Sequence, residues 1–279
     1  MWGWFGDVDR RAFFHEAQNA LQATARAWVV GWPVNNRQTG GPAQGDEPRR
    51  IACGMVGFTR QKGRVVQAAF YKIKLALRQY LRAILYTICM NAAQKLQHLQ
   101  QEIIAQNICP ELAAQATQLV MGSGNPRAKI VLIGEAPGKK EDAEGEPFVG
   151  ASGRFLDEML QAAGMARADV YITNIVKYRP PNNRDPSREE IAAFWPYLLR
   201  QLEIIDPRVV ITLGRHSGAC FIPKLVISEA HGQPRPVAFD EREFLVIPLY
   251  HPAAALYNGG MRQTLIDDFL AAAKVALRS

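Results

Sequence analysis

Four short apolar runs, each followed by polar residues, set the main pattern along this chain. Between and around them lie stretches whose apolar side chains recur at helical spacing. The apolar runs cover residues 130–133, 170–172, 209–213 and 244–249, and the helical stretches cover residues 92–106, 153–163, 188–204, 217–221 and 261–277. Strands that alternate with helices predict right-handed βαβ units and a parallel sheet. We therefore expect an α/β fold, a three-layer α/β/α sandwich with a central four-stranded parallel sheet.

Polar side chains follow these predicted strands closely. Glu135 comes after the first run, Asn174 after the second and His251 after the fourth. Open α/β sheets bind ligands at the carboxyl ends of their strands, so these side chains are expected to meet. An amide complements the edge of a pyrimidine, and a histidine can donate to a developing anion. A single residue of each kind is more typical of a structural role, so the prediction rests on the combination.

The segment after the first strand is rich in glycine and proline, a composition that permits close approach to a ligand. Phe148 lies within this polar loop. We expect an exposed ring that suits stacking on a flat base, and packing into the core is the alternative. Glu135 and Glu141, each taken alone, are typical of solvated carboxylates. Gly122-Ser123-Gly124 precedes the strand, so it indicates a turn and not a dinucleotide fingerprint.

Composition narrows the class of protein. The chain has 279 residues, 48% of them hydrophobic, and its four cysteines form no CxxC pair. Such cysteines argue for a reducing compartment and against a disulfide framework or a zinc site. Neither a signal peptide nor an apolar run of about 18 residues is found. We expect a cytoplasmic protein that does not associate with membranes.

The net charge of +7 belongs to the first third of the chain. Residues 1–89 carry 13 Lys and Arg against 5 Asp and Glu, whereas residues 90–279 carry 20 against 21. Residues 65–90 could form a basic amphipathic helix for nucleic acid or anionic lipid. The alternatives are a poorly ordered extension and a natural start at Met90. We therefore predict a basic N-terminal extension over 1–89 and a catalytic domain over 90–279.

A family resemblance extends over residues 91–279. It is carried by five segments at family spacing, which are 134–142, 148–153, 170–181 together with 183–186, 209–217 and 251–256. Together they resemble the uracil-DNA glycosylase superfamily, and family 4 is the closest match. The resemblance implies the superfamily fold, uracil-containing DNA as the partner and excision of uracil by hydrolysis of the N-glycosidic bond. A monomer is expected.

The resemblance also implies roles for individual residues. Phe148 would stack on the flipped uracil, and Asn174 would read its polar edge and reject cytosine. His251 would hydrogen-bond to the uracil carbonyl as negative charge develops on the leaving base. Glu135, with the Ala136 backbone, would line the pocket and help to place water, and Glu141 matches the second functional acidic position. This chemistry involves no metal.

Contacts with DNA are implied as well. The loop from Pro252 through Tyr257, which includes Ala253 and Leu256, would press into the minor groove and hold the base out of the stack. Ser217 and Arg262 are candidate phosphate contacts.

The chain departs from the family at the positions of an iron–sulfur cluster. Family 4 members usually hold a [4Fe–4S] cluster on four cysteines, and a cubane needs four such ligands. The third position here is Tyr178, the fourth corresponds to Phe194 or Trp195, and Cys109 fits neither of the first two cleanly. We predict that the cluster is absent and that aromatic packing replaces it. A superfamily branch that cross-links to DNA carries a histidine in the loop after the second strand, and residues 177–190 contain none, which favours turnover.

Two other functions compete with uracil excision. One is a glycosylase for another altered base, such as hypoxanthine or a modified cytosine. The other is a non-catalytic DNA-binding module that keeps the fold and uses the basic first third. The presence of Glu135, Asn174 and His251 together counts against the second.

Overall fold

A computed structural model describes residues 67, 71–72, 74–78, 90–239 and 242–278. The chain divides into two units, Met1–Cys89 and Met90–Ser279. The described residues of the first unit are helical and exposed. We expected an amphipathic helix over 65–90. The other residues of that range, apart from Met90, lie outside the described residues. The following paragraphs concern the second unit alone.

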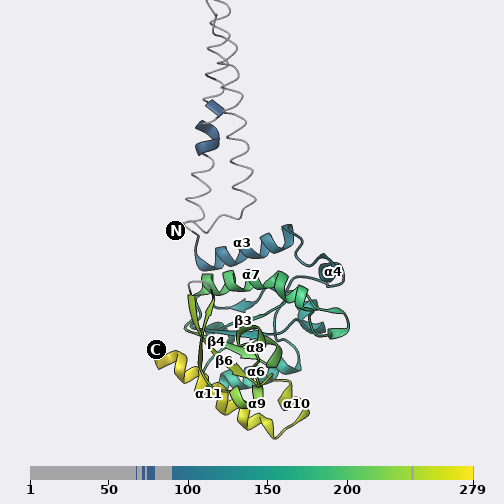
Figure 1. Ribbon diagram of the computed structural model, residues 1–279, viewed down its shortest axis with the longest axis vertical. Helices are drawn as coiled ribbons and strands as arrows, with labels where there is room; N and C mark the ends of the chain where they lie inside the picture. Colours follow the sequence, from purple (N-terminus) through teal and green to yellow (C-terminus); the bar gives the residue numbers. More distant parts are fainter. Residues whose placement is uncertain (1–66, 68–70, 73, 79–89, 240–241, 279) are drawn as a thin grey trace, which may run out of the picture. The chain divides into compact units, whose positions relative to one another are not determined.

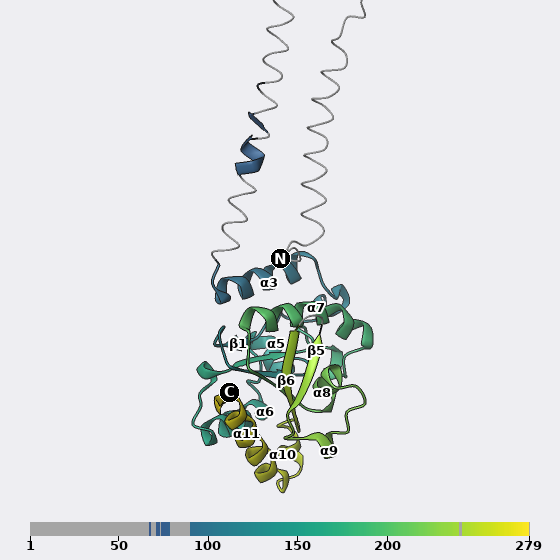
Figure 2. The same cartoon turned by 60° about the vertical axis from the view of Figure 1, so that its left-hand side comes forward.

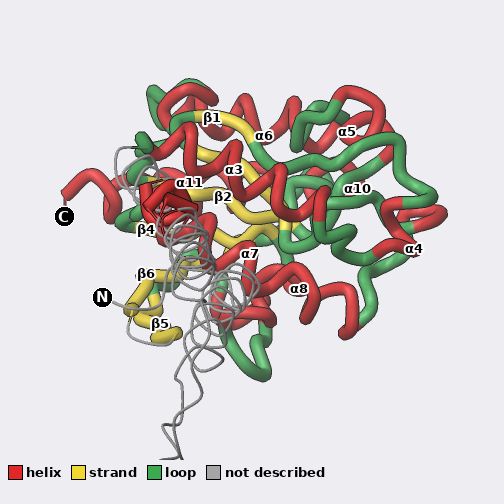
Figure 3. Tube along the Cα trace, turned by 90° about the horizontal axis from the view of Figure 1, so that it is seen from above, coloured by secondary structure: helices red, strands yellow, loops and turns green. Residues whose placement is uncertain are grey.

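A six-stranded sheet forms the middle of this unit (Figure 3). Its strands lie side by side in the order β1-β3-β2-β4-β6-β5. Their bounds are β1 Ser123–Gly124, β2 Ile130–Gly134, β3 Tyr171–Asn174, β4 Val209–Leu213, β5 Arg235–Phe239 and β6 Arg242–Leu249. The four central strands β3, β2, β4 and β6 are parallel, as the sequence predicts. The two edge strands β1 and β5 are antiparallel and were not expected.

Helices cover both faces of the sheet (Figures 1 and 2). Helix α3 (Ala92–Ala105) packs against α7 (Arg188–Ile205) on one face, and α6 (Ala151–Ala162) packs against α11 (Met261–Arg278) on the other. Shorter helices complete the chain: α4 Pro110–Ala113, α5 Lys139–Glu144, α8 Arg215–Phe221, α9 Ile227–Ala230 and α10 Ala254–Tyr257, with 3-10 turns at Arg167–Asp169 and Pro181–Asn183. This arrangement confirms the α/β/α sandwich.

The alternation of side chains along each strand separates two apolar cores. Val131 and Ile133 of β2 pack in the core beneath α3 and α7. Ile130 and Leu132 of the same strand pack in the core beneath α6 and α11. Because successive side chains of a strand point to opposite faces, a fully buried parallel strand feeds both cores and reads as a continuous apolar run.

Local signals fix where the longest helices begin. Ser187 accepts a hydrogen bond from the backbone N–H of Glu190, and the Glu190 carboxylate accepts one from the Ser187 backbone N–H. This capping box is the one that the sequence predicts for α7. Asn91 and Gln94 form the equivalent pair at the start of α3.

Two residues of the expected turn Gly122-Ser123-Gly124, namely Ser123 and Gly124, instead form the short strand β1. It pairs with β3, so that Gly124 lies close to the backbone of Val170. A Cβ atom on Gly124 would lie 2.1 Å from the Val170 carbonyl oxygen, and the φ angle of Gly124 is +113°. Glycine therefore permits the close approach of the two backbones, a requirement that local sequence does not reveal.

Within the described residues, we find no helix whose length and apolar character would let it cross a membrane.

Candidate active site

The carboxyl ends of the four parallel strands form one edge of the sheet. Asn174 ends β3, Glu135 follows β2, and His251 lies two residues beyond β6. The pairing of β2 with β3 continues past the strands, because the Ile175 N–H donates to the Gly134 carbonyl at 3.0 Å and the Val176 N–H to the Glu135 carbonyl at 3.1 Å. The backbone that carries Asn174 is therefore fixed beside the backbone that carries Glu135.

Four residues make up what we call the base cluster: Gly134, Phe148, Asn174 and His251. A Cβ atom on Gly134 would lie 2.4 Å from Oδ1 of Asn174 and 2.7 Å from two ring carbons of Phe148. The Phe148 ring stacks on the His251 imidazole, with 5.8 Å between ring centroids and 28° between planes. The structure thus brings Phe148, Asn174 and His251 together, as the sequence predicts.

Phe148 is buried, so the expectation of an exposed ring is wrong. Only 6% of the residue is exposed, and its φ angle of +55° is unusual for a bulky side chain. Arg167 clamps this conformation by donating to the backbone carbonyls of Pro147 and Phe148. Gly153 provides room, because a Cβ atom there would lie 1.6 Å from the Phe148 carbonyl oxygen. Backbone strain of this kind persists where the surroundings over-determine it, often at functional sites.

Asn174 presents an unused acceptor within the base cluster. The residue is 2% exposed, and its Oδ1 atom has no hydrogen-bond partner among the described residues. Leaving a buried polar atom unpaired costs roughly 1–3 kcal/mol, so such atoms in a native structure call for an explanation. A ligand that donates a hydrogen bond to Oδ1 would supply one.

His251 is held as a neutral imidazole of one tautomer. Burial lowers its pKa to about 4, although the negative charge of Glu141 acts in the opposite direction. Its Nδ1 atom accepts a hydrogen bond from the Ala253 backbone N–H at 3.1 Å. Because Nδ1 is the acceptor, the proton of the neutral ring lies on Nε2, which is then a donor.

Glu141, on α5, joins two parts of the glycine-rich segment. Its Oε1 atom accepts a hydrogen bond from the Gly150 backbone N–H at 2.9 Å. A Cβ atom on Gly138 would lie 2.7 Å from its Oε2 atom. The carboxylate therefore spans the loop that carries Phe148 and fixes the start of α6. Its negative charge also acts to raise the pKa of His251.

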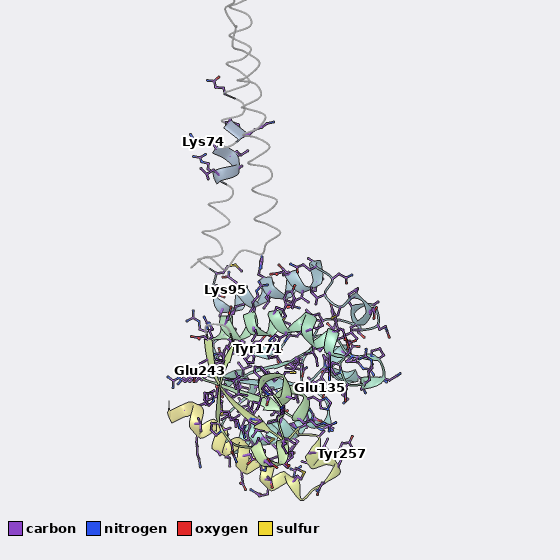
Figure 4. All side chains as sticks on the ribbon, in the orientation of Figure 1. Lys74, Lys95, Glu135, Tyr171, Glu243 and Tyr257 are labelled. Atoms are coloured by element: carbon purple, nitrogen blue, oxygen red, sulfur yellow. The ribbon has the colours of Figure 1, made fainter. Side chains whose placement is uncertain are left out.

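A second group, the charged cluster, consists of Glu135, Asp185, Arg215 and His216. Oε1 of Glu135 lies 3.1 Å from Nδ1 of His216, without the alignment of a hydrogen bond, and Asp185 lies 3.6 Å from Nε2. Arg215 donates from Nε to the same Nε2 at 2.8 Å. Burial raises the pKa of Glu135, while His216 and Arg215 oppose this and Asp185 adds to it. Figure 4 labels Glu135 at this edge of the sheet.

The donor types in the charged cluster are those that divalent cations use. Glu135, Asp185 and His216 each offer one ligand atom, and these atoms lie within 4.8 Å of one another. His216 would have to exchange one of its present contacts, because Nδ1 faces Glu135 and Nε2 accepts from Arg215. A guanidinium beside the ring also repels a cation. We therefore interpret this group as a network of ion pairs and hydrogen bonds.

Comparison with known proteins places this geometry in a family. The model described as the uracil DNA glycosylase superfamily matches residues 121–274, more than half of the chain. The chain belongs to the uracil-DNA glycosylase superfamily. A type-4 uracil-DNA glycosylase of Sulfurisphaera tokodaii is 46% identical over 180 residues, covering 62% of this chain and 81% of that protein. The type-4 enzyme of Saccharolobus solfataricus is 49% identical over 156 residues, covering 54% of this chain and 72% of that protein.

A third relative supports the same group within the superfamily. The type-4 uracil-DNA glycosylase of Archaeoglobus fulgidus is 46% identical over 182 residues, covering 63% of this chain and 90% of that protein. The resemblance to family 4 that the sequence motifs carry is therefore confirmed.

The [4Fe–4S] cluster associated with family 4 does not fit the residues present. Tyr178 stands at the third expected ligand position, and the fourth corresponds to Phe194 or Trp195. Tyr178 and Phe194 are buried and contact each other edge to face, with 5.9 Å between centroids. The two cysteines among the described residues, Cys109 and Cys220, are both unpaired thiols. The Cys109 thiol contacts the Glu190 carbonyl of α7 at 3.9 Å, and the Cys220 thiol contacts the His216 carbonyl within α8 at 3.4 Å. Four thiolates do not converge in this part of the chain.

Aromatic side chains pack where the sequence predicts them. Trp195 lies edge to face against Phe221 at 5.0 Å and against Phe239 at 5.2 Å between centroids. Together with Tyr178 and Phe194 these rings belong to the core beneath α3 and α7.

The segment after His251 forms the short helix α10. Pro252 is buried and Ala253 is half-buried, whereas Leu256 and Tyr257 are exposed, Tyr257 to 92% (Figure 4). Two exposed apolar side chains beside a candidate active site suit contact with an apolar surface, such as unstacked bases.

The two candidate phosphate contacts differ in their surroundings. Ser217, in the first turn of α8, is buried, and its hydroxyl donates to the Gly214 carbonyl at 3.2 Å. A phosphate contact of this side chain would require it to exchange that partner, and the contact stays a prediction. Arg262 is half-buried, forms an ion pair with Glu158 and lies over the Phe155 ring.

Sequence patterns missed three residues that shape the site. Arg167 clamps Phe148, His216 faces Glu135, and Lys177 lies fully buried three residues after β3. His216 lies three residues beyond β4, so its position after a strand end was a usable signal. The other two depend on contacts between distant segments.

Proposed function

We propose that this chain is a DNA repair enzyme that excises uracil by hydrolysing its N-glycosidic bond and leaves an abasic site. The observation that carries the proposal is the base cluster, in which Phe148, Asn174 and His251 meet over Gly134. The type-4 uracil-DNA glycosylases that the chain resembles support it. A glycosidic bond inside a duplex is out of reach, so the nucleotide must first be flipped out, at a cost of a few kcal/mol.

Asn174 supplies the selectivity for uracil. Uracil presents an N3–H donor beside the O4 acceptor, which matches the unpaired Oδ1 of Asn174 and its amide N–H. Cytosine presents the reverse order, an N3 acceptor beside an amino donor. Oδ1 would then face a lone pair in a site with little water, which is costly.

His251 supplies the donor for the leaving base. When the bond between C1′ and N1 breaks, its electron pair leaves with uracil, and negative charge spreads onto the carbonyl oxygens. The Nε2–H of neutral His251 donates a hydrogen bond to one of these carbonyl oxygens, and this bond strengthens as the negative charge develops. Phe148 holds the plane of the base beside this donor.

Water completes the reaction at the sugar. Its oxygen bonds to C1′ of the oxocarbenium-like sugar, and the proton that it loses balances the charge of the uracil anion. Glu135 and the Ala136 backbone place this water, and Glu141 holds the loop around the base. The carboxylate of Glu135 also favours the positive charge on the sugar.

The α10 segment holds the DNA open. Leu256 and Tyr257 enter the minor groove and support the gap left by the flipped base, with Pro252 and Ala253 at the base of the turn. Arg262 contacts a phosphate after exchanging its partner Glu158. Unstacking a step costs a few kcal/mol, which contacts with the bent DNA offset.

The enzyme works without an iron–sulfur cluster, as a monomer in the cytoplasm. The aromatic packing at Tyr178, Phe194 and Trp195 supports the first statement. Purified protein is expected to lack absorbance near 400 nm and bound iron, whereas about four irons per chain would contradict it. Size-exclusion chromatography with light scattering tests the monomer, and fractionation of the native cells tests the location.

Residues 90–279 form the catalytic domain, and residues 1–89 a basic extension. The family match lies wholly within the former range. Equal excision by the full chain and by residues 90–279 is the expected result.

The test of the function uses the full chain and labelled oligonucleotides with one altered base. Uracil, cytosine, thymine, hypoxanthine and 5-hydroxymethylcytosine are placed in the same sequence, single-stranded and opposite guanine. Alkali then reveals abasic sites. We expect cleavage at uracil alone; cleavage only at hypoxanthine or the modified cytosine, or binding without cleavage, would contradict the proposal.

A further inference from the structure

A lysine with no exposed surface lies directly behind the base cluster. Lys177 follows β3 by three residues and is 0% exposed. Its Nζ atom donates to Oγ1 of Thr173 at 2.6 Å, to the Asn174 carbonyl at 2.8 Å and to Oε1 of Gln201 at 2.7 Å. All three partners are uncharged, so the ammonium is buried among neutral acceptors.

The number of acceptors matches the charged form of the amine. An ammonium has three N–H donors, and each finds one acceptor here. A neutral amine would leave one of the three unmatched. The acceptors are themselves oriented, because Thr173 donates to the Met121 carbonyl at 2.8 Å, and Gln201 donates to the same carbonyl and to the Tyr171 hydroxyl, each at 3.0 Å.

This network fixes the backbone that presents Asn174. The bonds from Lys177 to Thr173 and Asn174 hold the bend that follows β3. The Lys177 carbonyl in turn accepts from the Val120 N–H at 2.8 Å. Within the bend, the Val176 N–H donates to the Glu135 carbonyl. The backbones of both Asn174 and Glu135 are therefore tied to one buried ammonium.

Charge adds to geometry. In a medium of low dielectric constant a fixed positive charge acts over a longer range than in water. The ammonium polarises the Asn174 peptide, whose side chain faces the base, so it favours negative charge that develops on the leaving uracil.

A role for Lys177 as a nucleophile is excluded by the same contacts. A lysine that attacks an abasic sugar must reach solvent with a free lone pair, and Nζ is fully buried and fully bonded. Borohydride is therefore expected to trap no covalent complex with DNA.

We propose that Lys177 is a positioning residue of the uracil site, which fixes the Asn174 backbone through three hydrogen bonds and places a buried positive charge behind the base. This inference rests on the proposed function. It goes beyond it by assigning part of the rate to a residue that does not touch the substrate.

The charge of Lys177 changes close to neutral pH. Burial lowers the pKa of this lysine to about 7, so the ammonium is present below that value and is lost above it.

The other titratable groups around Lys177 do not change charge in the same way. Burial raises the pKa of Tyr171 to about 12, and it raises the pKa of Tyr178 and Tyr197, so these phenols stay neutral. On α7, Arg200 is paired with Glu102. The pKa of His251 is about 4, and Glu135, whose pKa is raised, ionises as pH rises.

The experiment measures single-turnover uracil excision by the full chain between pH 5 and 9. The variants are K177M, which keeps the length of the side chain without charge, and K177R, which keeps the charge. K274M, at an exposed position of α11, is the matched control. Thermal unfolding of each variant shows that the assay temperature leaves it folded.

We expect the wild-type rate to fall as pH rises through about 7 and the K274M profile to match it. K177M should be slower by about 10- to 100-fold below pH 7, in line with the cost of small displacements at an active site, and should lack the alkaline fall. A merely structural lysine would change the melting temperature but not the pH profile. K177R should recover part of the rate without the alkaline fall.

Two results would overturn the inference while leaving the proposed function intact: a folded K177M with the wild-type rate, or one that keeps the alkaline fall. If K177M does not fold, the pH profile of T173V is measured instead. T173V removes one acceptor of the Lys177 ammonium, which lowers the pKa of the lysine, so the alkaline fall in rate must move to lower pH. An unchanged profile in T173V would refute the role of Lys177. Absence of excision by the wild type would instead refute the proposed function.

Discussion

The base cluster and the charged cluster lie at the same edge of the sheet, yet they are built in opposite ways. Phe148 and Asn174 are buried, and His251 is half-buried, with enough desolvation to lower its pKa and keep the ring neutral. Glu135 and His216 are partly exposed, and Asp185 is mostly exposed. The comparison suggests a division of labour, in which a dry and neutral group reads the base while a charged and wetter group faces the sugar and water.

Differences in solvation explain why the base cluster and the charged cluster are kept apart. A hydrogen bond from a buried neutral donor is strong because no water competes for it. An unpaired charge in the same place would cost several kcal/mol. Charges are tolerated in the second group because solvent and opposite charges reach them.

The largest effect is expected in the base cluster. H251A removes the donor to the leaving base, and removal of one such donor typically slows an enzyme by about 10²- to 10³-fold. Single-turnover excision at pH 7 measures this. H98A, at an exposed histidine of α3, is the matched control and should retain the wild-type rate. Equal rates for H251A and H98A would remove His251 from the mechanism.

Glycine at position 134 gives a second test of the base cluster. G134A places a Cβ atom against Asn174 and Phe148, at 2.4 and 2.7 Å before adjustment, so both side chains must move. We expect a loss of about 100-fold in rate, the cost of a displacement near 1 Å. G259A is the matched control, because no atom lies within 4 Å of a Cβ atom there. A G134A protein as active as G259A would show that the cluster does not set the geometry.

The charged cluster should respond with a change in pH dependence rather than a collapse in rate. His216 lowers the pKa of Glu135, so H216A should raise it. A carboxylate with a higher pKa ionises at higher pH, so the acidic fall in rate should move to higher pH, with a loss of a few-fold at pH 7 in the range of about 1 kcal/mol for a partly exposed ion pair. A shift to lower pH would contradict the assignment of Glu135.

The smallest effect is expected on α10. Y257A removes an exposed side chain that supports the gap in the duplex. We expect a loss of a few-fold on duplex DNA and less on single-stranded DNA, because a single strand needs no unpairing. Y71A, at another exposed tyrosine, is the control. An equal loss on both substrates would argue against a wedge.

Much of the site could be predicted because parallel strands impose a simple rule. Glu135, Asn174 and His251 were found from their places after apolar runs, since parallel strands end at one edge. The capping box of α7 was visible because its two residues are three positions apart.

The remainder depends on contacts between segments far apart in the chain. The burial of Phe148 needs Arg167, Gly134 and the α6 start, and that of Lys177 needs Gln201 from α7. Polar sequence around Phe148 and the charge of Lys177 both predict exposed side chains, whereas both side chains are buried. The edge strand β1 is two residues long and shows no strand pattern of its own.

The most direct measurement is a crystal structure of the chain with free uracil. The account predicts that uracil lies against the Phe148 ring, with its N3–H and O4 edge on the Asn174 amide and its other carbonyl oxygen at Nε2 of His251. Uracil bound at the charged cluster instead, or an Asn174 amide that does not contact the base, would contradict it.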